Sequence, residues 1–474
     1  MRSSSERDSR SLVLGTTVNS RESENPRRQA VPRDSKSDLP EAYYIIARMF
    51  SPLRRTLAEV RAWLSTLRRV GLRVFLTLTV LQAAIVGVLV AMAEFRKRRQ
   101  GPREGFPWED QPEIGMESGE DRLKIYAYGV SLYEAMLDEI EAAQDEIFVG
   151  TFIWKGDEIG RRFVDALARK AREGVDVYVV FDGLANVFVP PSFKRFPERI
   201  HRLHFRPLSG PAKILNPRNV FRFHRHVMSV DGRAAFLGGY NIGSLYAAGW
   251  RDTHVRVRGD AAREVDNAFV DFWNAHRTEE LPRITPNKER DWNPAVRVRR
   301  NDPYMRIFPI REMYIEAIDR ANSHIYLTHA YFVPDRAMKA HLIDATKRGV
   351  DVQLLVPEHS NHVTVDWLAR RHFYELLKNG VRIFLYRHIM IHSKTATADG
   401  LWSTIGSANI DRLSMLGNYE LNIEVYSGRL AAQMERMFEM DKTNAEEVTL
   451  EEWERRPLPA KVVERTLASL SPLV

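Results

Sequence analysis

The sequence contains no cysteine in its 474 residues. This absence excludes disulfide bonds, thiolate zinc sites, iron–sulfur clusters and cysteine nucleophiles. It leaves the cellular compartment open, because a chain without cysteine is indifferent to redox conditions. Hydrophobic residues make up 44% of the chain and charged residues 28%, which is typical of a folded protein with room for more than one domain.

Net positive charge is scarce outside the N-terminal fifth. Residues 1–99 hold 19 of the 70 Lys and Arg residues but only 9 of the 62 Asp and Glu residues, a surplus of +10. The whole chain carries +8, so residues 100–474 carry −2. Proteins that bind nucleic acid usually present a basic body, so we expect no nucleic-acid partner. The basic N-terminal segment instead suits the anionic headgroups of a lipid bilayer.

Long apolar runs are also scarce, and the clearest one covers residues 74–93. It contains no charged residue and, at about 1.5 Å per helical residue, spans the roughly 30 Å of a bilayer core. We predict a single-pass anchor in the cell membrane, because a cleaved signal peptide normally begins nearer the N-terminus and has a shorter apolar run. Basic residues flank both ends, so the positive-inside comparison favours neither orientation.

The segments around this anchor differ in composition. Residues 1–40 are rich in Ser, Arg, Asp and Pro, which predicts a disordered basic tail. Residues 41–73 predict an Arg-rich amphipathic helix, with Ser51 before the helical Pro52. Its apolar face would comprise Leu53, Leu57, Val60, Leu64 and Leu67. This helix either lies at the membrane interface or packs on its own protein, and residues 94–121 are predicted to form a linker.

Strand and helix patterns alternate after the linker. Apolar runs predict strands at 123–128, 146–153 and 175–181, separated by a helix that begins in a capping box at Ser131 and by a helix at 157–172. The same plan recurs in the second half about 170–178 residues later. We therefore predict an α/β fold of two pseudo-repeated lobes, each a mixed sheet flanked by helices, covering residues 122–290 and 291–474.

A related string of polar residues occurs near the end of each predicted lobe. The first string contains His224, His226, Asp231, Asn241 and Asp252. The second string contains His392, Lys394, Asp399, Asn409 and Glu420. Each member stands at the same offset from its leading histidine in both lobes. Matching offsets in a duplicated chain predict one shared site rather than ten unrelated surface residues.

These residue types suit chemistry on a phosphodiester. Residues i and i+2 of a strand share a face, so His392 and Lys394 would present an imidazole beside an ammonium. Histidines from the two lobes would flank one phosphate as nucleophile and acid, with Asn241 and Asn409 as neutral donors. We expect no metal, because the matched positions lack the clustered carboxylates that hold Mg²⁺.

The acidic members of the strings have two predicted roles. Asp252 and Glu420 are candidates to accept the second ring N–H of the histidines, which fixes the tautomer and raises basicity, or to form surface ion pairs. Asp231 and Asp399 belong to the candidate catalytic set by their place in the strings. Their position at the start of a turn favours an alternative role, in which they bind backbone amides.

The paired strings resemble the HxKxxxxD and GxxN motifs of the phospholipase D superfamily. The runs WRDTHV at 250–255, AYFVPD at 330–335 and GSANID at 406–411 are similar to those of bacterial cardiolipin synthases. The resemblance covers about residues 120–445. It implies a phosphohistidine intermediate without a cofactor, with His224 as nucleophile and His392 as general acid and base, although the symmetric spacing permits the reverse.

His226 departs from the motif, which has lysine at that position. Because an unperturbed histidine is largely neutral at pH 7, three interpretations follow. The enzyme is active with His226 as a pH-dependent cation, has altered substrate choice, or is a degenerate member that only binds lipid. In the first case activity should rise toward acidic pH. The positions of Arg222 and Arg225 in the sequence do not show that either arginine replaces the lysine.

The predicted function is that of a membrane-bound phosphatidyltransferase acting on phosphatidylglycerol or a related phospholipid. With a second phosphatidylglycerol as acceptor, the resemblance implies cardiolipin and glycerol as products. With water as acceptor the same chemistry is that of a hydrolytic phospholipase D, which releases phosphatidate. A nucleic-acid phosphodiesterase is a weaker alternative because of the near-neutral body.

Overall fold

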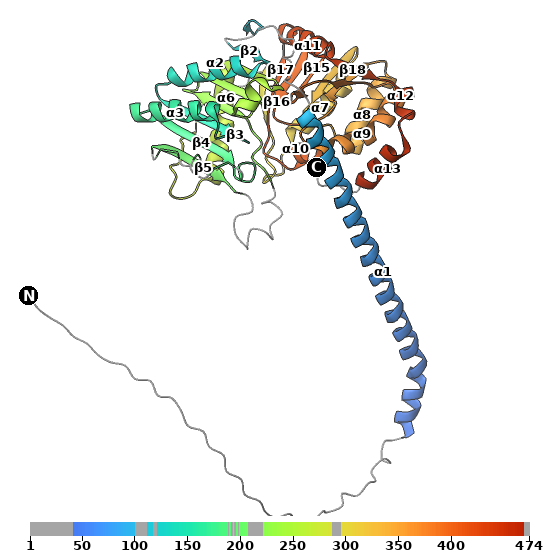
Figure 1. Ribbon diagram of the computed structural model, residues 1–474. Helices are drawn as coiled ribbons and strands as arrows, with labels where there is room; N and C mark the ends of the chain where they lie inside the picture. Colours follow the sequence, from blue (N-terminus) through green and yellow to red (C-terminus); the bar gives the residue numbers. More distant parts are fainter. Residues whose placement is uncertain are drawn as a thin grey trace, which may run out of the picture. The chain divides into compact units, whose positions relative to one another are not determined.

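The computed structural model describes most of the chain (Figure 1). The described residues are 41–99, 111–116, 121–187, 189–190, 193, 196–197, 199–206, 221–286 and 295–468. The predicted disordered tail, residues 1–40, lies outside them. The chain divides into two units, residues 1–77 and residues 78–474.

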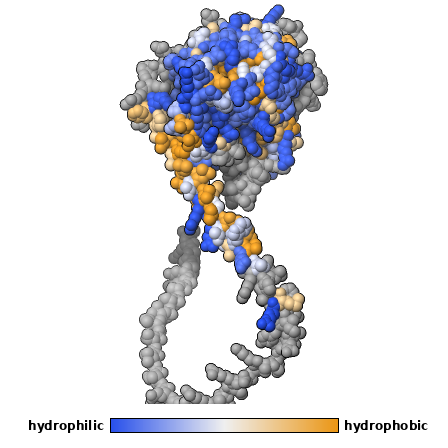
Figure 2. Space-filling view, turned by 90° about the vertical axis from the view of Figure 1, so that its right-hand side faces the viewer, coloured by the Kyte–Doolittle hydropathy of each residue, from blue (hydrophilic) through white to orange (hydrophobic). Residues whose placement is uncertain are grey.

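Helix α1 spans Glu41–Arg99 without a break. It continues through Ser51 and Pro52, so the predicted helix start at Ser51 is not observed, and the predicted linker contains the last helical residues. Among the described residues, α1 is long and apolar enough over Glu59–Arg96 to cross a membrane. Figure 2 shows hydrophobic atoms gathered along the described part of this helix.

The later part of α1 packs against the protein. Leu89 belongs to the hydrophobic core of the second lobe, and the Gln82 side-chain amide donates a hydrogen bond of 2.8 Å to the Thr466 carbonyl. Leu78, Val80 and Val88 remain exposed. The predicted anchor therefore has one face on the lobe and another face available to lipid.

The first lobe contains an eight-stranded mixed sheet in the order β1-β2-β9-β7-β6-β3-β4-β5. Its strands are β1 (Ile114–Gly115), β2 (Arg122–Tyr126), β3 (Glu146–Thr151), β4 (Asp176–Asp182), β5 (Ile200–Phe205), β6 (Val227–Val230), β7 (Ala234–Gly238) and β9 (His254–Arg258). Its helices are α2 (Gly129–Glu141), α3 (Glu158–Glu173), α5 (Ser244–Ala248) and α6 (Asp260–His276). The β1 strand lies inside the predicted linker.

The second lobe repeats this plan, with strand order β10-β17-β16-β15-β11-β12-β13-β18. Its strands are β10 (Val296–Arg300), β11 (His324–His329), β12 (Asp351–Pro357), β13 (Arg382–Tyr386), β15 (Lys394–Ala398), β16 (Trp402–Gly406), β17 (Leu421–Tyr426) and β18 (Ala445–Val448). Its helices are α7 (Pro309–Arg320), α8 (Arg336–Lys347), α9 (Val363–Lys378), α10 (Arg412–Leu416), α11 (Gly428–Lys442), α12 (Leu450–Glu454) and α13 (Leu458–Leu467). The predicted α/β fold with two repeated lobes is confirmed.

The repeat extends to strand direction. In each lobe three strands run parallel, β3-β4-β5 and β11-β12-β13, and the strand that follows the leading histidine pairs antiparallel with the first of them. Val255 of β9 and Ile423 of β17 lie in one hydrophobic core with Phe269 of α6 and Met434 of α11. The lobes therefore pack as one body with continuous apolar contact between them.

One local prediction differs from the structure. Helix α2 begins at Gly129, and Ser131 donates its hydroxyl to the Tyr128 carbonyl instead of forming a capping box. A Cβ at Gly129 would lie 2.7 Å from the Tyr246 carbonyl oxygen. The close approach of α5 to this glycine accounts for the earlier start, which side-chain capping preferences do not encode.

Candidate active site

Each leading histidine is held by a backbone segment of the other lobe. Strand β8 (Trp250–Arg251) of the first lobe pairs in parallel with β14 (Met390–Ile391) of the second. The backbone N–H of His392 then donates to the Arg251 carbonyl at 2.6 Å. On the opposite side, the N–H of His224 donates to the Tyr419 carbonyl at 3.0 Å. The site is thus assembled from both lobes.

The imidazole side chains also pair between the lobes. His224 Nδ1 lies 2.9 Å from both carboxylate oxygens of Glu420, and His392 Nδ1 lies 2.6 Å from Asp252 Oδ2. Each histidine therefore takes its carboxylate from the opposite lobe. With Nδ1 donating to a carboxylate, the neutral ring leaves its Nε2 lone pair free for attack or proton transfer.

Burial sets the protonation of the His392 pair. Burial raises the pKa of Asp252 to about 6, and the carboxylate also accepts the Thr253 N–H at 2.7 Å. Burial, followed by the charge of Lys394 and then by His224, lowers the pKa of His392 well below its ordinary value. At neutral pH this pair is an ionised Asp252 beside a neutral His392, and the two histidines are close enough to influence each other.

The position two residues after each histidine differs between the lobes. Lys394 is fully buried and donates to the His392 carbonyl, and burial lowers its pKa to about 8. His226 is buried, and neither of its ring nitrogens has a hydrogen-bond partner among the described residues. Burial, followed by the charge of His224 and then of Lys394, lowers the pKa of His226 well below its ordinary value. Both observations argue against a protonated His226, and among the described residues Lys394 is the buried lysine ammonium beside the two histidines.

The two neighbouring arginines have different surroundings. Arg225 is buried, and its guanidinium donates to the carbonyls of Ala268, Asn301 and Glu420, so it is committed to the core. Arg222 is held by Asp182, with its Nε 3.0 Å and its Nη2 2.5 Å from the carboxylate oxygens.

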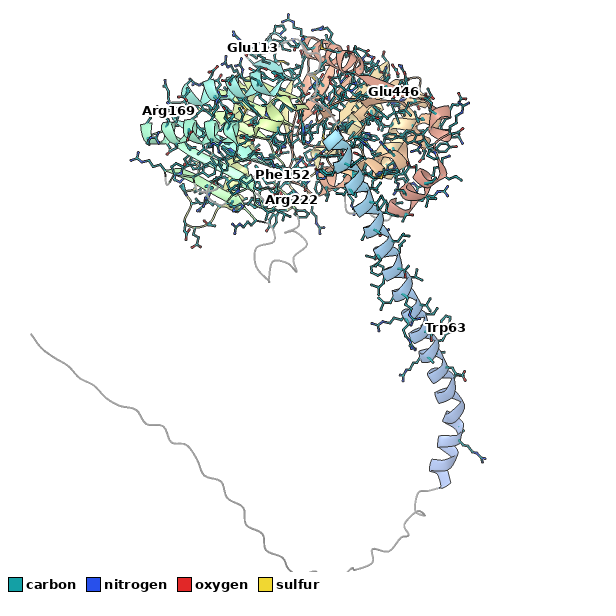
Figure 3. All side chains as sticks on the ribbon, in the orientation of Figure 1. Trp63, Glu113, Phe152, Arg169, Arg222 and Glu446 are labelled. Atoms are coloured by element: carbon teal, nitrogen blue, oxygen red, sulfur yellow. The ribbon has the colours of Figure 1, made fainter. Side chains whose placement is uncertain are left out.

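Arg222 also borders the site. Its guanidinium carbon lies 5.1 Å from the centre of the Phe152 ring, and that ring packs 4.7 Å from His224. Figure 3 shows Phe152 and Arg222 together on one edge of the body. Of the two arginines, Arg222 is therefore the one placed at the rim of the site.

The two asparagines each brace a loop. Asn241 Oδ1 accepts the Ile153 N–H at 2.8 Å, and Asn409 Oδ1 accepts the Tyr331 N–H at 3.4 Å. These bonds fix the orientation of both side chains. They leave each amide NH₂ group without a protein acceptor among the described residues, so it can donate to an anionic ligand.

Asp231 and Asp399 lie away from the histidines. Each follows the far end of its strand, at about 3.3 Å per residue roughly 23 Å from the leading histidine, and each has a left-handed φ of 51°. Asp231 accepts the N–H groups of residues 144–146, and Asp399 accepts those of residues 322–324. This geometry fits the turn-binding alternative and not contact with reacting atoms.

Several residues that the sequence argument did not single out as functional hold the site together. Arg251 is fully buried and forms a bidentate ion pair with Asp441, with distances of 2.9 and 2.8 Å. Ser407 donates to Glu420 at 2.5 Å. Arg251 and Ser407 lie within the runs that carry the family resemblance, whereas Asp182 and Asp441 lie outside them and carry no local signal.

Aromatic rings wall the centre. The Trp250 ring packs 4.9 Å from His392, and Tyr331 packs 6.0 Å from the same histidine. Apolar walls exclude water and strengthen the electrostatic interactions of the buried groups. In the part of the chain that the structure describes, no group of three or more His, Asp or Glu side chains is arranged to hold a metal ion.

Known proteins are similar to this chain in sequence. The family model described as "Cardiolipin synthase, PLD-like domain" matches residues 136–273 and 314–442. The cardiolipin synthase of Clostridium perfringens is 31% identical over 370 residues, covering 74% of this chain and 77% of the relative. The major cardiolipin synthase ClsA of Bacillus subtilis is 30% identical over 367 residues, covering 75% and 76%. Cardiolipin synthase 1 of Staphylococcus epidermidis is 32% identical over 373 residues, covering 75% and 74%.

The fold is also shared with a solved structure. The crystal structure of phosphatidylserine synthase from Haemophilus influenzae matches with a TM-score of 0.58 at 14% identity, covering 81% of this chain and 97% of that chain. At this identity the match concerns the fold alone. Taken with the family model and the relatives, the two crossed histidine sites place this chain in the phospholipase D superfamily, as a member of its cardiolipin synthase family.

Proposed function

We propose that this protein is a membrane-bound phosphatidyltransferase that makes cardiolipin from two molecules of phosphatidylglycerol. The observation that carries the proposal is the crossed pair of histidines, each with a buried carboxylate from the opposite lobe, beside the buried Lys394. The curated relatives are named cardiolipin synthases over about three quarters of the chain. These two lines of support are independent, since one is geometric and the other is sequence similarity.

The first step is attack on the donor lipid. His224 Nε2 forms a bond to phosphorus, and the bond from phosphorus to the glycerol headgroup oxygen breaks. His392, which is neutral before the donor lipid binds, takes up a proton when the anionic phosphodiester binds beside it. It then gives this Nε2 proton to the headgroup oxygen, so glycerol leaves as a neutral alcohol. A phosphatidyl group then remains on His224, while His392 is neutral and ready to act as a base.

The second step returns the enzyme to its starting state. The hydroxyl of the acceptor attacks phosphorus, its proton moves to His392 Nε2, and the phosphorus–nitrogen bond to His224 breaks. Glu420 and Asp252 hold the two rings and stabilise the charge that each ring carries in turn. Water in place of the lipid hydroxyl would give phosphatidate, which is the second candidate activity.

A few placed groups would hold the phosphate. We assign the non-bridging oxygens to the Lys394 ammonium and to the amide NH₂ groups of Asn241 and Asn409. His226 would contribute a neutral N–H donor. Arg222 lies at the rim of the site beside Phe152, but its guanidinium is paired with Asp182, so it adds no net charge in place of the missing lysine at residue 226.

The experiment is to incubate the full-length protein in vesicles of labelled phosphatidylglycerol and to resolve the lipid products and free glycerol. Cardiolipin and glycerol in equal amounts support the proposal. Phosphatidate without cardiolipin supports hydrolysis instead. A folded wild-type protein that forms no product would contradict both activities and leave a lipid-binding role.

A further inference from the structure

A cleft of about 470 Å³ opens beside the active site. Its walls come from three parts of the second unit: the end of α1 at Arg96, the first lobe at Lys155 and Leu245, and the 358–362 loop between β12 and α9. Among the described residues, α1 is long and apolar enough to cross a membrane, so the cleft lies beside the end of the candidate membrane span.

The cleft opens on the His392 side of the centre. Trp250 lines it and packs 4.9 Å from the His392 ring. His362 also lines it and packs 5.5 Å from Tyr331, which in turn contacts His392. Trp250 is therefore a wall that the cleft shares with the His392 site, whereas Phe152, which packs against His224, does not line the cleft.

The walls are amphipathic. Leu245 is 50% exposed, whereas the apolar Ile389 and Met390, which also line the cleft, are buried. Lys155 is half-buried, and no ion pair among the described residues engages it or Arg96. The cleft therefore combines apolar surface that suits hydrocarbon with cationic groups that suit an anion.

The remaining polar groups add little charge. Burial, followed by Arg96, lowers the pKa of His359 to about 4, so this imidazole is neutral at pH 7. Glu358 is the carboxylate in the lining, and it lies 3.7 Å from His359. The net charge of the cleft is positive because Lys155 and Arg96 outnumber this carboxylate.

The side on which the cleft opens matters for the reaction. In an in-line displacement at phosphorus, the leaving alcohol and the incoming alcohol both occupy the face opposite the nucleophile. With His224 as nucleophile, that face is the one that His392 serves. An acceptor that enters here must carry a hydroxyl, and the walls favour one that also carries an anion and apolar chains.

We propose that this cleft is the binding site of the acceptor phospholipid, whose own phosphate contacts Lys155 and Arg96 while its acyl chains pass along Leu245 toward α1. Its terminal glycerol hydroxyl, one glycerol unit from that phosphate, reaches the phosphatidyl group on His224. The hydroxyl proton moves to His392, the new phosphorus–oxygen bond forms, and the bond to His224 breaks. This inference rests on the proposed function and specifies its second substrate.

The test compares two products of one phosphohistidine. The variant Lys155→Ala/Arg96→Ala is incubated with vesicles of phosphatidylglycerol in phosphatidylcholine, and cardiolipin and phosphatidate are measured together. We expect cardiolipin to fall about tenfold relative to phosphatidate, because the acceptor lipid loses its anion contacts while water does not need them. The variant Arg172→Ala, which removes an exposed charge at the end of α3, should keep the wild-type ratio.

Two further variants make the outcome decisive. The single variant Lys155→Arg keeps the charge and should keep the wild-type ratio of cardiolipin to phosphatidate. The single variant Leu245→Glu should lower this ratio by placing a charge on the apolar wall. An unchanged product ratio in the double alanine variant, or an equal loss of both products in a folded protein, would overturn the inference. Failure of the proposed function looks different, since wild type would then form no cardiolipin at all.

Discussion

The two lobes carry the same motif on the same strands, yet they differ at the residue two positions after the histidine. In the second lobe Lys394 pairs in register with His329 across β15 and β11. In the first lobe Gly150 of β3 pairs with Val227 of β6. Extending this antiparallel register by one residue places Thr151 opposite His226. A buried imidazole is therefore present in each lobe, while the ammonium is present in one.

This difference leaves the two lobes with unequal charge at matched positions. Two buried ammonium groups within one cavity would repel each other and would both be costly to desolvate. One ammonium, two amide donors and a neutral imidazole can still surround a singly charged phosphodiester. The two lobes should therefore contribute unequally to phosphate binding, and variants at matched positions can measure that inequality.

The largest effect should come from the leading histidines. His224→Ala should abolish turnover and covalent labelling, and His392→Ala should slow turnover by about 10³-fold or more because leaving and incoming alcohols lose their proton carrier. Lipid product formation at matched protein folding is the measurement. Substantial activity in either variant would contradict the division of roles between the lobes.

The next largest effect should come from the unequal position. Lys394→Met should reduce kcat/KM by about 10²–10³-fold, because the buried cation is lost, whereas His226→Met should cost about tenfold or less. Steady-state kinetics on phosphatidylglycerol give both values. Equal losses in the two variants would mean that the lobes contribute equally to phosphate binding.

The crossed carboxylates should have a smaller effect. Asp252→Asn and Glu420→Gln should each lower kcat by about 10–100-fold, since the rings keep a hydrogen-bond partner but lose the charge that supports the imidazolium. A double variant should cost less than the product of the two single effects if both serve one phosphate. Full multiplicativity would argue for two independent sites.

The pH profile follows from the same groups. Lys394 is charged below its pKa of about 8, so kcat/KM should fall as pH rises through that value. Asp252 is ionised above its pKa of about 6, so activity should also fall as pH drops through that value. Lys394→Arg should remove the alkaline fall. A profile rising steadily toward acid would instead restore a protonated His226.

The smallest effect on chemistry should come from the turn aspartates. Asp231→Ala and Asp399→Ala should each lower the free energy of unfolding by about 1–3 kcal/mol, because three backbone amides lose their acceptor. Activity per folded molecule should change little. Chemical denaturation measured beside activity checks this, and a large loss of kcat with unchanged stability would return these residues to the catalytic set.

Much of the site could be predicted because the motif occurs twice in the duplicated sequence. Equal offsets from His224 and His392 predict, from the sequence alone, that the asparagines and carboxylates belong to one site. The pairing of each histidine with a carboxylate of the other lobe could not be predicted. Asp252 and Glu420 stand at the same offset from their leading histidines, and His224 contacts a carboxylate 196 residues away. The inward turn of Arg225 and the loss of the Ser131 cap likewise depend on packing between distant segments.

In the proposed mechanism a first-lobe histidine carries the phosphatidyl group while a second-lobe histidine moves the proton. The direct measurement is peptide mass analysis of wild-type protein quenched in alkali during turnover with labelled phosphatidylglycerol. We predict a phosphatidyl adduct on the peptide that contains His224. An adduct on the peptide that contains His392, or cardiolipin formation without any adduct, would contradict it.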